Sequence, residues 1–360
     1  MRKKNFILAK RLAAGLLVAC LLGSTNIVFS YAEEHQSPLV VQDLLTNGVD
    51  SPEAIDPGSP LFSWEIQSNK RGCYQTAYQI IVTENLSGKQ VWDSGKVNSN
   101  QSSYVSYSGP TLASDTEYDW KVRTWDNFNN VSEYSSPSSF RIGLDTTAWQ
   151  ANYIWDGTEN QNNFAYFRKS FQVNQPITQA VVYTSAHNDY QLYVNGNFVG
   201  VGPARSDPYT YDQYCAYDIT EQLKEGENVF ASLAHWHGAW SDSGVNASPA
   251  YILEAHITYE DGSTDIIKTD DTWKVSPTTP YKEEDPVYFG HYGGVNNRAS
   301  IYYDSQKEMD GWNTVGFDDQ SWQNATVVDR SNYQLYAQLV SEEKEKEWME
   351  PVSITQQGDK

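Results

Sequence analysis

Apolar and polar residues alternate in short runs along most of the chain, and residues that favour turns separate these runs. In TAYQIIVT (76–83) the alternate positions are Tyr78, Ile80 and Val82, and in TEYDWKVRTWD (116–126) they are Tyr118, Trp120 and Val122. Because successive side chains of a strand point to opposite faces, this period of two predicts half-buried β-strands. About seven such strands between residues 38 and 143, with no helical period, predict a β-sandwich. Tyr118 lies where a tyrosine corner would pin one end of it.

The same alternation continues after residue 150. In residues 189–200, DYQLYVNGNFVG, the pair Asn195-Gly196 predicts a two-residue hairpin loop, since both positions of such a loop need a positive φ. The register that follows pairs Val194 with Asn197 and Leu192 with Val199. Residues 251–259 alternate with their apolar side inward, so that His256 would face solvent. We expect residues 150–330 to form a jelly-roll sandwich and residues 331–360 a linker, which makes the chain all-β with two sandwiches in series.

Composition and charge narrow the possible functions. The net charge of −21 disfavours binding to nucleic acids and to anionic membrane surfaces, which need a basic footprint. Aromatic residues make up 14% of the chain, which is enough for two cores and a surface. Apart from Cys20, the two cysteines Cys73 and Cys215 have no metal-binding spacing, so we expect two isolated buried thiols.

The N-terminus has the features of a secretory signal peptide. Basic residues precede the apolar run LAAGLLVACLLG, and SYA at 30–32 is a small-residue cleavage site. We therefore expect removal of residues 1–32 and secretion to the extracellular space. Acylation at Cys20 within LVAC is the alternative, disfavoured because apolar residues follow the cysteine. No other segment is long and apolar enough to span a membrane.

Several motifs in a fixed order carry a family resemblance. TAYQI, VWDSGKV, FRKSF, YQLYVNGNFVGVGPARSDP, YDIT and FDDQSW follow one another as they do in bacterial α-L-rhamnosidases of glycoside hydrolase family 78. The resemblance covers about residues 38–350. It implies a fibronectin type III-like domain at 38–143, followed at 150–330 by the galactose-binding-like sandwich that precedes the catalytic domain in this family.

The resemblance also implies what the chain lacks. The family's catalytic acid and base lie in a large α-helical toroid, and the chain stops before such a domain. We therefore expect either that this chain is truncated or that the catalytic domain is separately encoded, and in both cases no turnover by this chain alone. A glycosidase needs two carboxyl groups facing each other across the sugar. The adjacent pair Asp318-Asp319 does not provide this, because neighbours on a strand point to opposite faces, and FDDQSW is interpreted as a capped turn.

The most unusual stretch is residues 235–246, HWHGAWSDSGVN. Aromatic rings stack on sugar faces, and amide, carboxylate and imidazole groups bond to sugar hydroxyls. A sugar site and a purely structural role for these rings both remain open. The sugar-contact candidates from this loop and from two neighbouring segments are Asn188, Asp189, Tyr190, Tyr211, His235, Trp236, His237 and Trp240.

A calcium ion is implied by the family resemblance alone. In a rhamnose-binding relative of this sandwich, calcium lies between an adjacent acid–amide pair and the sugar. Asn188 and Asp189 occupy the matching place and offer the oxygen ligands that calcium prefers. The expected partner is a rhamnose-containing glycan. The other functions considered are a structural or adhesive sandwich pair that binds no sugar, and a hydrolase whose site the sequence does not reveal.

Overall fold

The structure is a computed structural model that describes residues 39–159, 163–204, 211–236, 248–284, 300–330 and 333–338, with isolated positions beyond 338. It is built almost wholly of strands, in agreement with the all-β prediction, and its one helical segment in these residues is the 3₁₀ turn η1 (Ser305–Lys307). No helix in the described part has the length and apolar character that crossing a bilayer requires. The expected signal peptide, with Cys20, lies outside the described residues.

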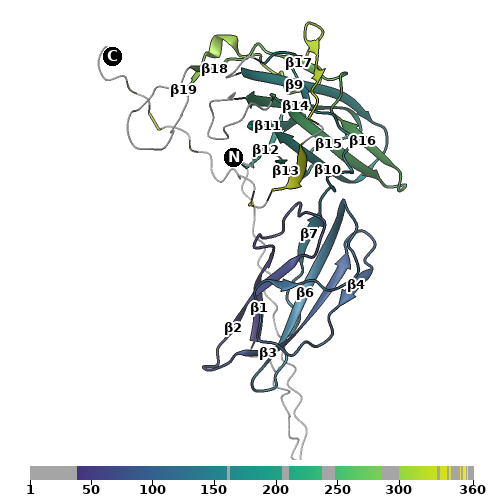
Figure 1. Cartoon of the computed structure of the whole chain (residues 1–360), viewed down its shortest axis with the longest axis vertical. Coiled ribbons are helices and arrows are strands. Elements are labelled where there is room, and N and C mark those ends of the chain that lie inside the picture. The colour runs from purple at the N-terminus through teal and green to yellow at the C-terminus, as the bar shows by residue number, and fades with distance from the viewer. Residues whose placement is uncertain are drawn as a thin grey trace, which may run out of the picture. The chain divides into compact units, whose positions relative to one another are not determined.

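The first sandwich consists of a three-stranded and a four-stranded sheet (Figure 1). The three-stranded sheet has the order β1-β2-β5 and the four-stranded sheet the order β4-β3-β6-β7. The strands are β1 (Leu39–Thr46), β2 (Leu61–Ser68), β3 (Gln75–Glu84), β4 (Gln90–Asp93), β5 (Val105–Ser106), β6 (Thr116–Asp126) and β7 (Ser138–Ile142).

The core of this sandwich follows from the alternation. On β3 and β6, the residues predicted to face inward, among them Ile80, Val82 and Trp120, are almost completely buried. The Tyr118 hydroxyl accepts a hydrogen bond from the backbone N–H of Ala113 at 2.9 Å. A hydroxyl bonded to the backbone a few residues upstream is the geometry of a tyrosine corner, so this prediction is confirmed.

The second sandwich packs two larger sheets face to face. One sheet has the order β21-β8-β15-β10-β13-β22, with β16 also paired to β15, and the other has the order β12-β11-β14-β9-β17-β20. The strands of these two sheets are β8 (Ile154–Trp155), β9 (Asn163–Val173), β10 (Ile177–Ala186), β11 (Asp189–Val194), β12 (Asn197–Gly202), β13 (Tyr211–Asp218), β14 (Gly226–Trp236), β15 (Tyr251–Tyr259), β16 (Thr264–Lys268), β17 (Lys274–Ser276), β20 (Gln323–Asn324), β21 (Thr326–Val327) and β22 (Gln334–Ala337). The strands β18 (Tyr281–Glu284) and β19 (Ser300–Tyr303) pair with each other in a separate two-stranded sheet.

The hairpin β11–β12 confirms the predicted turn but not the whole register. Asn195 and Gly196 both have positive φ, 52° and 85°, and Val194 pairs with Asn197 as expected. Leu192, however, pairs with Gly200 rather than with Val199, because the register shifts by one residue between Leu192 and Tyr193. The shift is a β-bulge on β12, in which two residues of one strand oppose a single residue of the other.

The predicted linker at 331–360 is wrong in part. Residues 334–337 form β22, which pairs in parallel with β13 and so extends the sheet at its edge. The backbone N–H of Ala337 on this strand donates a hydrogen bond to the carboxylate of Asp56, a residue of the first sandwich, at 2.7 Å.

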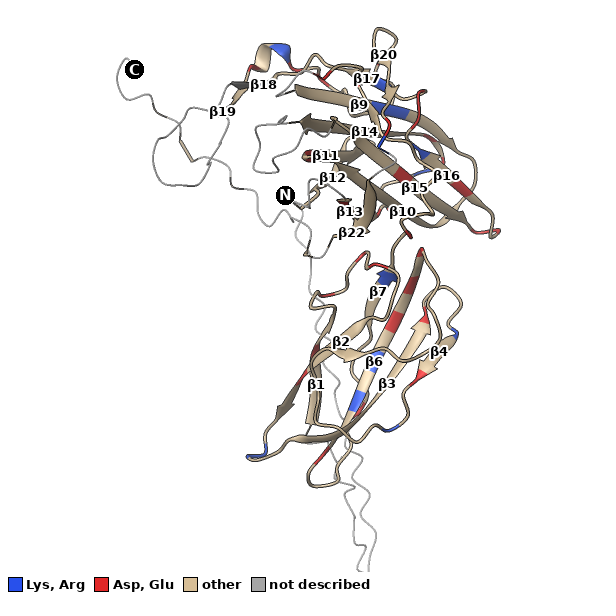
Figure 2. Ribbon diagram, in the orientation of Figure 1, with Lys and Arg blue, Asp and Glu red and all other residues tan. Residues whose placement is uncertain are grey.

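Acidic residues occur throughout both sandwiches, and the two described cysteines form no disulfide. Asp and Glu are spread over strands and loops of both sandwiches (Figure 2). Cys73 and Cys215 are both free thiols, and Cys215 is buried as expected. Cys73 is only half-buried, which corrects the expectation that both thiols are buried.

Candidate functional site

Asp189 and His235 lie side by side at one end of the second sandwich. Asp189 is the first residue of β11, and its register partner on the antiparallel strand β14 is His235. The Asp189 Oδ2 atom lies 3.9 Å from the His235 Nδ1 atom. The Asp189 side chain is 55% exposed, whereas that of His235 is only 6% exposed. The pair therefore presents a solvent-facing carboxylate with an imidazole behind it.

The His235 ring is fixed by an aromatic partner. Phe164 on β9 pairs with His235 in the sheet register, and the two rings stack with centroids 3.8 Å apart and an interplanar angle of 2°. The ring of Tyr281 packs against Phe164, with 5.5 Å between the ring centroids. The stack fixes the direction in which the imidazole edge points.

Two of the predicted sugar contacts belong to the core. Tyr190 is 1% exposed and Trp236 is 5% exposed, and both lie in the main hydrophobic cluster between the sheets. The Tyr190 hydroxyl is 3.1 Å from that of Tyr217. Because neighbours on a strand alternate in direction, Tyr190 and Trp236 point inward where Asp189 and His235 point outward. The expectation that these two rings contact a sugar is therefore corrected.

The remaining candidates divide between described and undescribed residues. Asn188 is half-buried and directly precedes Asp189, so it stays next to the site. Tyr211 is half-buried at the start of β13 and makes an edge contact with Tyr336, with 5.4 Å between ring centroids. His237 and Trp240 lie outside the described residues.

A buried charged cluster that the sequence did not predict supports this end of the sandwich. Arg330 donates a hydrogen bond to His187 Nδ1 at 3.1 Å and forms an ion pair with Asp212 at 3.0 Å. The side chains of Arg330 and Asp212 are 2% and 1% exposed. The backbone N–H of His187 also bonds to the carbonyl of Ala250 at 3.0 Å. Residue 187 is thereby held firmly beside Asn188 and Asp189.

The expected calcium ligands, Asn188 and Asp189, are sequence neighbours where β11 begins. No three His, Cys, Asp or Glu side chains are grouped as metal ligands in the described part of the chain. Calcium takes six to eight oxygen ligands. The described candidates for such ligands are Asn188 and Asp189, and the carboxylate of Asp189 faces an imidazole nitrogen.

The pair Asp318-Asp319 has structural roles, as interpreted from the sequence. Asp318 accepts a hydrogen bond from the backbone N–H of Gln320 at 3.1 Å and so caps a local turn. Asp319 binds the Nε atom of Arg168 at 2.9 Å. Two further N–H···O bonds tie Arg168 to the carbonyls of Trp312 and Thr314, at 2.8 and 2.9 Å.

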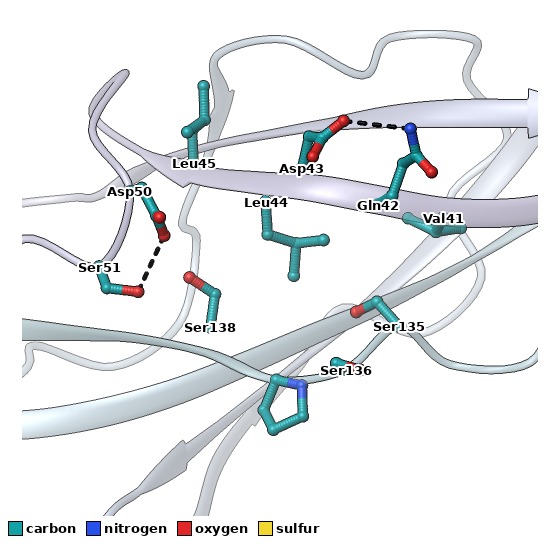
Figure 3. Close-up of a pocket in the computed structure, with 11 residues that line it drawn as sticks. Val41, Gln42, Asp43, Leu44, Leu45, Asp50, Ser51, Ser135, Ser136 and Ser138 are labelled. Carbon is teal, nitrogen blue, oxygen red and sulfur yellow. Dashed lines mark hydrogen bonds between the residues drawn. The ribbon is translucent and has the colours of Figure 1, made fainter. Parts of the chain in front are cut away.

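The first sandwich contains an open groove of about 420 Å³ between β1 and the segment that leads into β7 (Figure 3). Its two carboxylates are bonded to their sequence neighbours: Gln42 donates to Asp43 at 3.1 Å, and Ser51 donates to Asp50 at 3.0 Å. No aromatic side chain lines it. Because sugar sites rely on stacking rings, this groove is a poorer candidate than the end of the second sandwich.

Two family models match the chain. One describes a Rha78A-like N-terminal immunoglobulin domain and matches residues 41–146, and the other describes the α-L-rhamnosidase N-terminal domain and matches residues 175–347. The first match covers most of the first sandwich, and the second begins after β9 of the second sandwich.

Individual relatives show the same similarity. An α-L-rhamnosidase of Formosa agariphila is 30% identical over an alignment of 377 positions, which covers 92% of this chain and 38% of the relative. One from Alteromonas sp. is 28% identical and covers 78% of this chain and 32% of the relative. The chain thus spans about a third of the length of these relatives.

Solved structures extend the similarity to the fold. An α-L-rhamnosidase from Dictyoglumus thermophilum has a TM-score of 0.73 and 29% identity, and the match covers 82% of this chain and 35% of that one. The native enzyme from Aspergillus terreus has a TM-score of 0.70 at 23% identity, with 83% and 35% covered, and shows the fold alone.

Proposed function

Because the chain belongs to the N-terminal, two-sandwich region of the α-L-rhamnosidases of glycoside hydrolase family 78, we propose that it acts as a secreted accessory region that binds rhamnose-containing glycans. The relatives are named for the hydrolysis of α-L-rhamnosides, which makes rhamnose the first sugar to test.

The observation that carries the proposal is the exposed carboxylate of Asp189 held against the fixed imidazole of His235. A carboxylate accepts hydrogen bonds from two adjacent hydroxyls, and an imidazole nitrogen donates or accepts one more. A few convergent polar groups beside aromatic side chains are typical of small-ligand sites. Asn188 adds an amide next to this pair, and the buried Arg330 binds the preceding residue, His187.

We expect affinity in the micromolar to millimolar range, or roughly −8 to −4 kcal/mol, since the contacts are few and partly exposed to solvent. Titration calorimetry with L-rhamnose measures it directly. Asp189→Ala should weaken binding about tenfold or more. The matched control is Asp271→Ala, which removes an exposed aspartate from a turn of the same sandwich. An equal loss in both variants, or no heat from the parent chain at tens of millimolar sugar, contradicts the proposal. A repeat of the titration with calcium and with a chelator shows whether an ion contributes.

The accessory role further predicts no hydrolysis by the chain alone, with the chemistry supplied by a catalytic domain. The acidic pair that a search for catalytic carboxylates would first select, Asp318-Asp319, is engaged in a turn cap and an ion pair. An assay with an aryl α-L-rhamnoside tests this. Release of the aryl group that is abolished by replacing one carboxylate would support the alternative, a hydrolase with an unrecognised site. Binding of no sugar on a glycan array would support a structural sandwich pair.

Secretion is part of the same proposal. It rests on the basic, apolar and small-residue segments of residues 1–32. N-terminal sequencing of the exported protein should begin at Glu33, and a lipid-modified N-terminus at Cys20 would contradict soluble secretion.

A further inference from the structure

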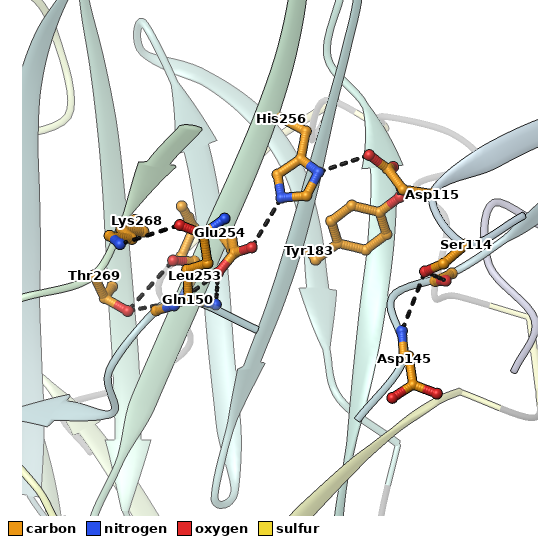
Figure 4. Close-up of polar contacts among 12 residues, drawn as sticks. Ser114, Asp115, Asp145, Gln150, Tyr183, Leu253, Glu254, His256, Lys268 and Thr269 are labelled. Atoms are coloured by element: carbon orange, nitrogen blue, oxygen red, sulfur yellow. Dashed lines mark hydrogen bonds and ion pairs between the residues drawn. The ribbon is translucent and has the colours of Figure 1, made fainter. Parts of the chain in front are cut away.

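His256 connects the two sandwiches, which corrects the expectation that it faces solvent. It lies on β15, on the face opposite the core, where its Nδ1 atom is 2.6 Å from Asp115 Oδ2 and its Nε2 atom is 2.8 Å from Glu254 Oε1 (Figure 4). Asp115 belongs to the first sandwich, just before β6, and Glu254 to the second. The His256 side chain is 20% exposed. One imidazole therefore bridges two carboxylates from different domains.

Glu254 links the same bridge to the connecting segment. Its side chain is completely buried, and its Oε2 atom accepts the backbone N–H groups of Gln150 and Ala151 at 2.6 and 2.7 Å. These two residues lie between the last strand of the first sandwich and the first strand of the second. A chain of bonds thus runs from the connecting segment through Glu254 and His256 to Asp115.

Apolar packing surrounds this chain of bonds. Ala54 and Leu144, at the end of the first sandwich, share a buried cluster with Tyr183 and Tyr214 of the second. The Tyr214 hydroxyl donates to the Leu144 carbonyl at 3.1 Å, and that of Tyr183 donates to Asp115. A Cβ atom placed on Gly143 would lie 2.1 Å from the Tyr214 hydroxyl, so this close approach requires glycine.

A second polar tie lies on the same interface. Gln179 of β10 donates to Glu117 of β6 at 3.0 Å, and Glu117 also pairs with the buried Arg141 at 3.1 Å. Polar and apolar contacts of this kind resemble those of a specific, preformed interface rather than of two domains joined by a free linker.

We propose that the two sandwiches fold and move as one rigid unit. In this proposal the hydrogen-bonded triad of Asp115, His256 and Glu254 couples them. The protonated imidazole donates from both nitrogens, so both carboxylates are satisfied only while it carries a proton. The proposal does not depend on sugar binding.

The surrounding charges favour the protonated state. Burial by itself lowers the pKa of His256, but the hydrogen bonds to Asp115 and Glu254 and their negative charges outweigh it and raise the pKa to about 9. Tyr183 faces the imidazole edge-on, with ring centroids 5.7 Å apart. Among the other charged groups, Lys268 is the register partner of Glu254 on β16, and Arg141 interacts electrostatically with Tyr183.

Hydrogen exchange of the backbone amides in the connecting segment tests this coupling, because two of these amides are bonded to Glu254. In the parent chain at neutral pH, the amides of Gln150 and Ala151 should be protected and thermal unfolding should be a single transition. His256→Gln cannot carry the charge and Asp115→Asn removes one carboxylate. Each should speed exchange of these amides by about tenfold or more, the effect of losing a charge-assisted hydrogen bond, and should split or broaden the transition.

Glu65→Gln is the matched control, since Glu65 is an exposed carboxylate of the first sandwich away from this network. It should change neither readout. Because Asp115 lies in a surface turn, its variant keeps the test valid if His256→Gln fails to fold. Two separate transitions in the parent chain, or unchanged exchange in both interface variants, would overturn the proposal.

Discussion

Replacing Asp319 with alanine leaves the buried guanidinium of Arg168 without its carboxylate partner. The Arg168 side chain is 1% exposed, and the ion pair spans 2.9 Å. Breaking a buried pair by removing one partner costs about 3–5 kcal/mol when the remaining charge has no compensation. Here the carbonyls of Trp312 and Thr314 still accept from Arg168, and Asp319 is itself 25% exposed, so we place the loss at about 2–3 kcal/mol.

A loss of this size is easily measured. For a domain of 150–250 residues, each kcal/mol shifts the midpoint of thermal unfolding by about 2–4 °C, so we expect a fall of about 4–12 °C. The neighbouring substitution Asp318→Ala removes only a turn cap and should cost about 1 kcal/mol or less. Thermal unfolding followed by tryptophan fluorescence compares the two variants. Equal midpoints for the two would refute the assignment of Asp319 as the partner of a buried charge.

Three further predictions concern other parts of the fold. The pKa of His256 is raised from 6.5 to about 9 in the folded state, so its ionisation contributes about 3 kcal/mol to the free energy of unfolding. This contribution is complete below pH 6.5 and is lost as the pH rises through 9. Urea unfolding across this range should show the loss in the parent chain but not in His256→Gln. Tyr118→Phe removes the hydrogen bond from Ala113 and should lower the free energy of unfolding by about 1 kcal/mol, whereas no change would argue against the tyrosine corner. Gly196→Ala should destabilise by about 1–2 kcal/mol, as φ is +85° there and the new Cβ would lie 2.9 Å from Thr314 Cγ2; a neutral result in the same urea assay would contradict this strain.

Local patterns in the sequence were sufficient for the strands and for the turn at Asn195-Gly196. They were not sufficient for the register beyond it, where β12 carries a bulge beside a contact with another strand. Tyr217 of β13 lies so close to Gly200 that a Cβ there would be 2.4 Å from its ring. Glycine at this point allows the ring to approach, and no property of the hairpin alone indicates it.

The outer faces of strands show the same limit. Alternation places His256 opposite the core, but whether that face meets water or another domain depends on residues far away in the sequence. Its partner Asp115 is 141 residues distant, and the Arg330 partner of His187 is 143 residues distant. The candidate site was foreseen in part for this reason. The adjacent Asn188 and Asp189 and the unusual residue His235 stand out locally, whereas the inward direction of Tyr190 and Trp236 follows only from the strand bounds.

The most direct test of the proposed function is to follow the backbone amide signals of the isotope-labelled chain by NMR while L-rhamnose is added. The account predicts saturable shifts at residues 187–190 and 234–236, where β11 begins and β14 ends, and unchanged signals around the groove of the first sandwich. Shifts confined to that groove, or none at tens of millimolar rhamnose, would contradict it.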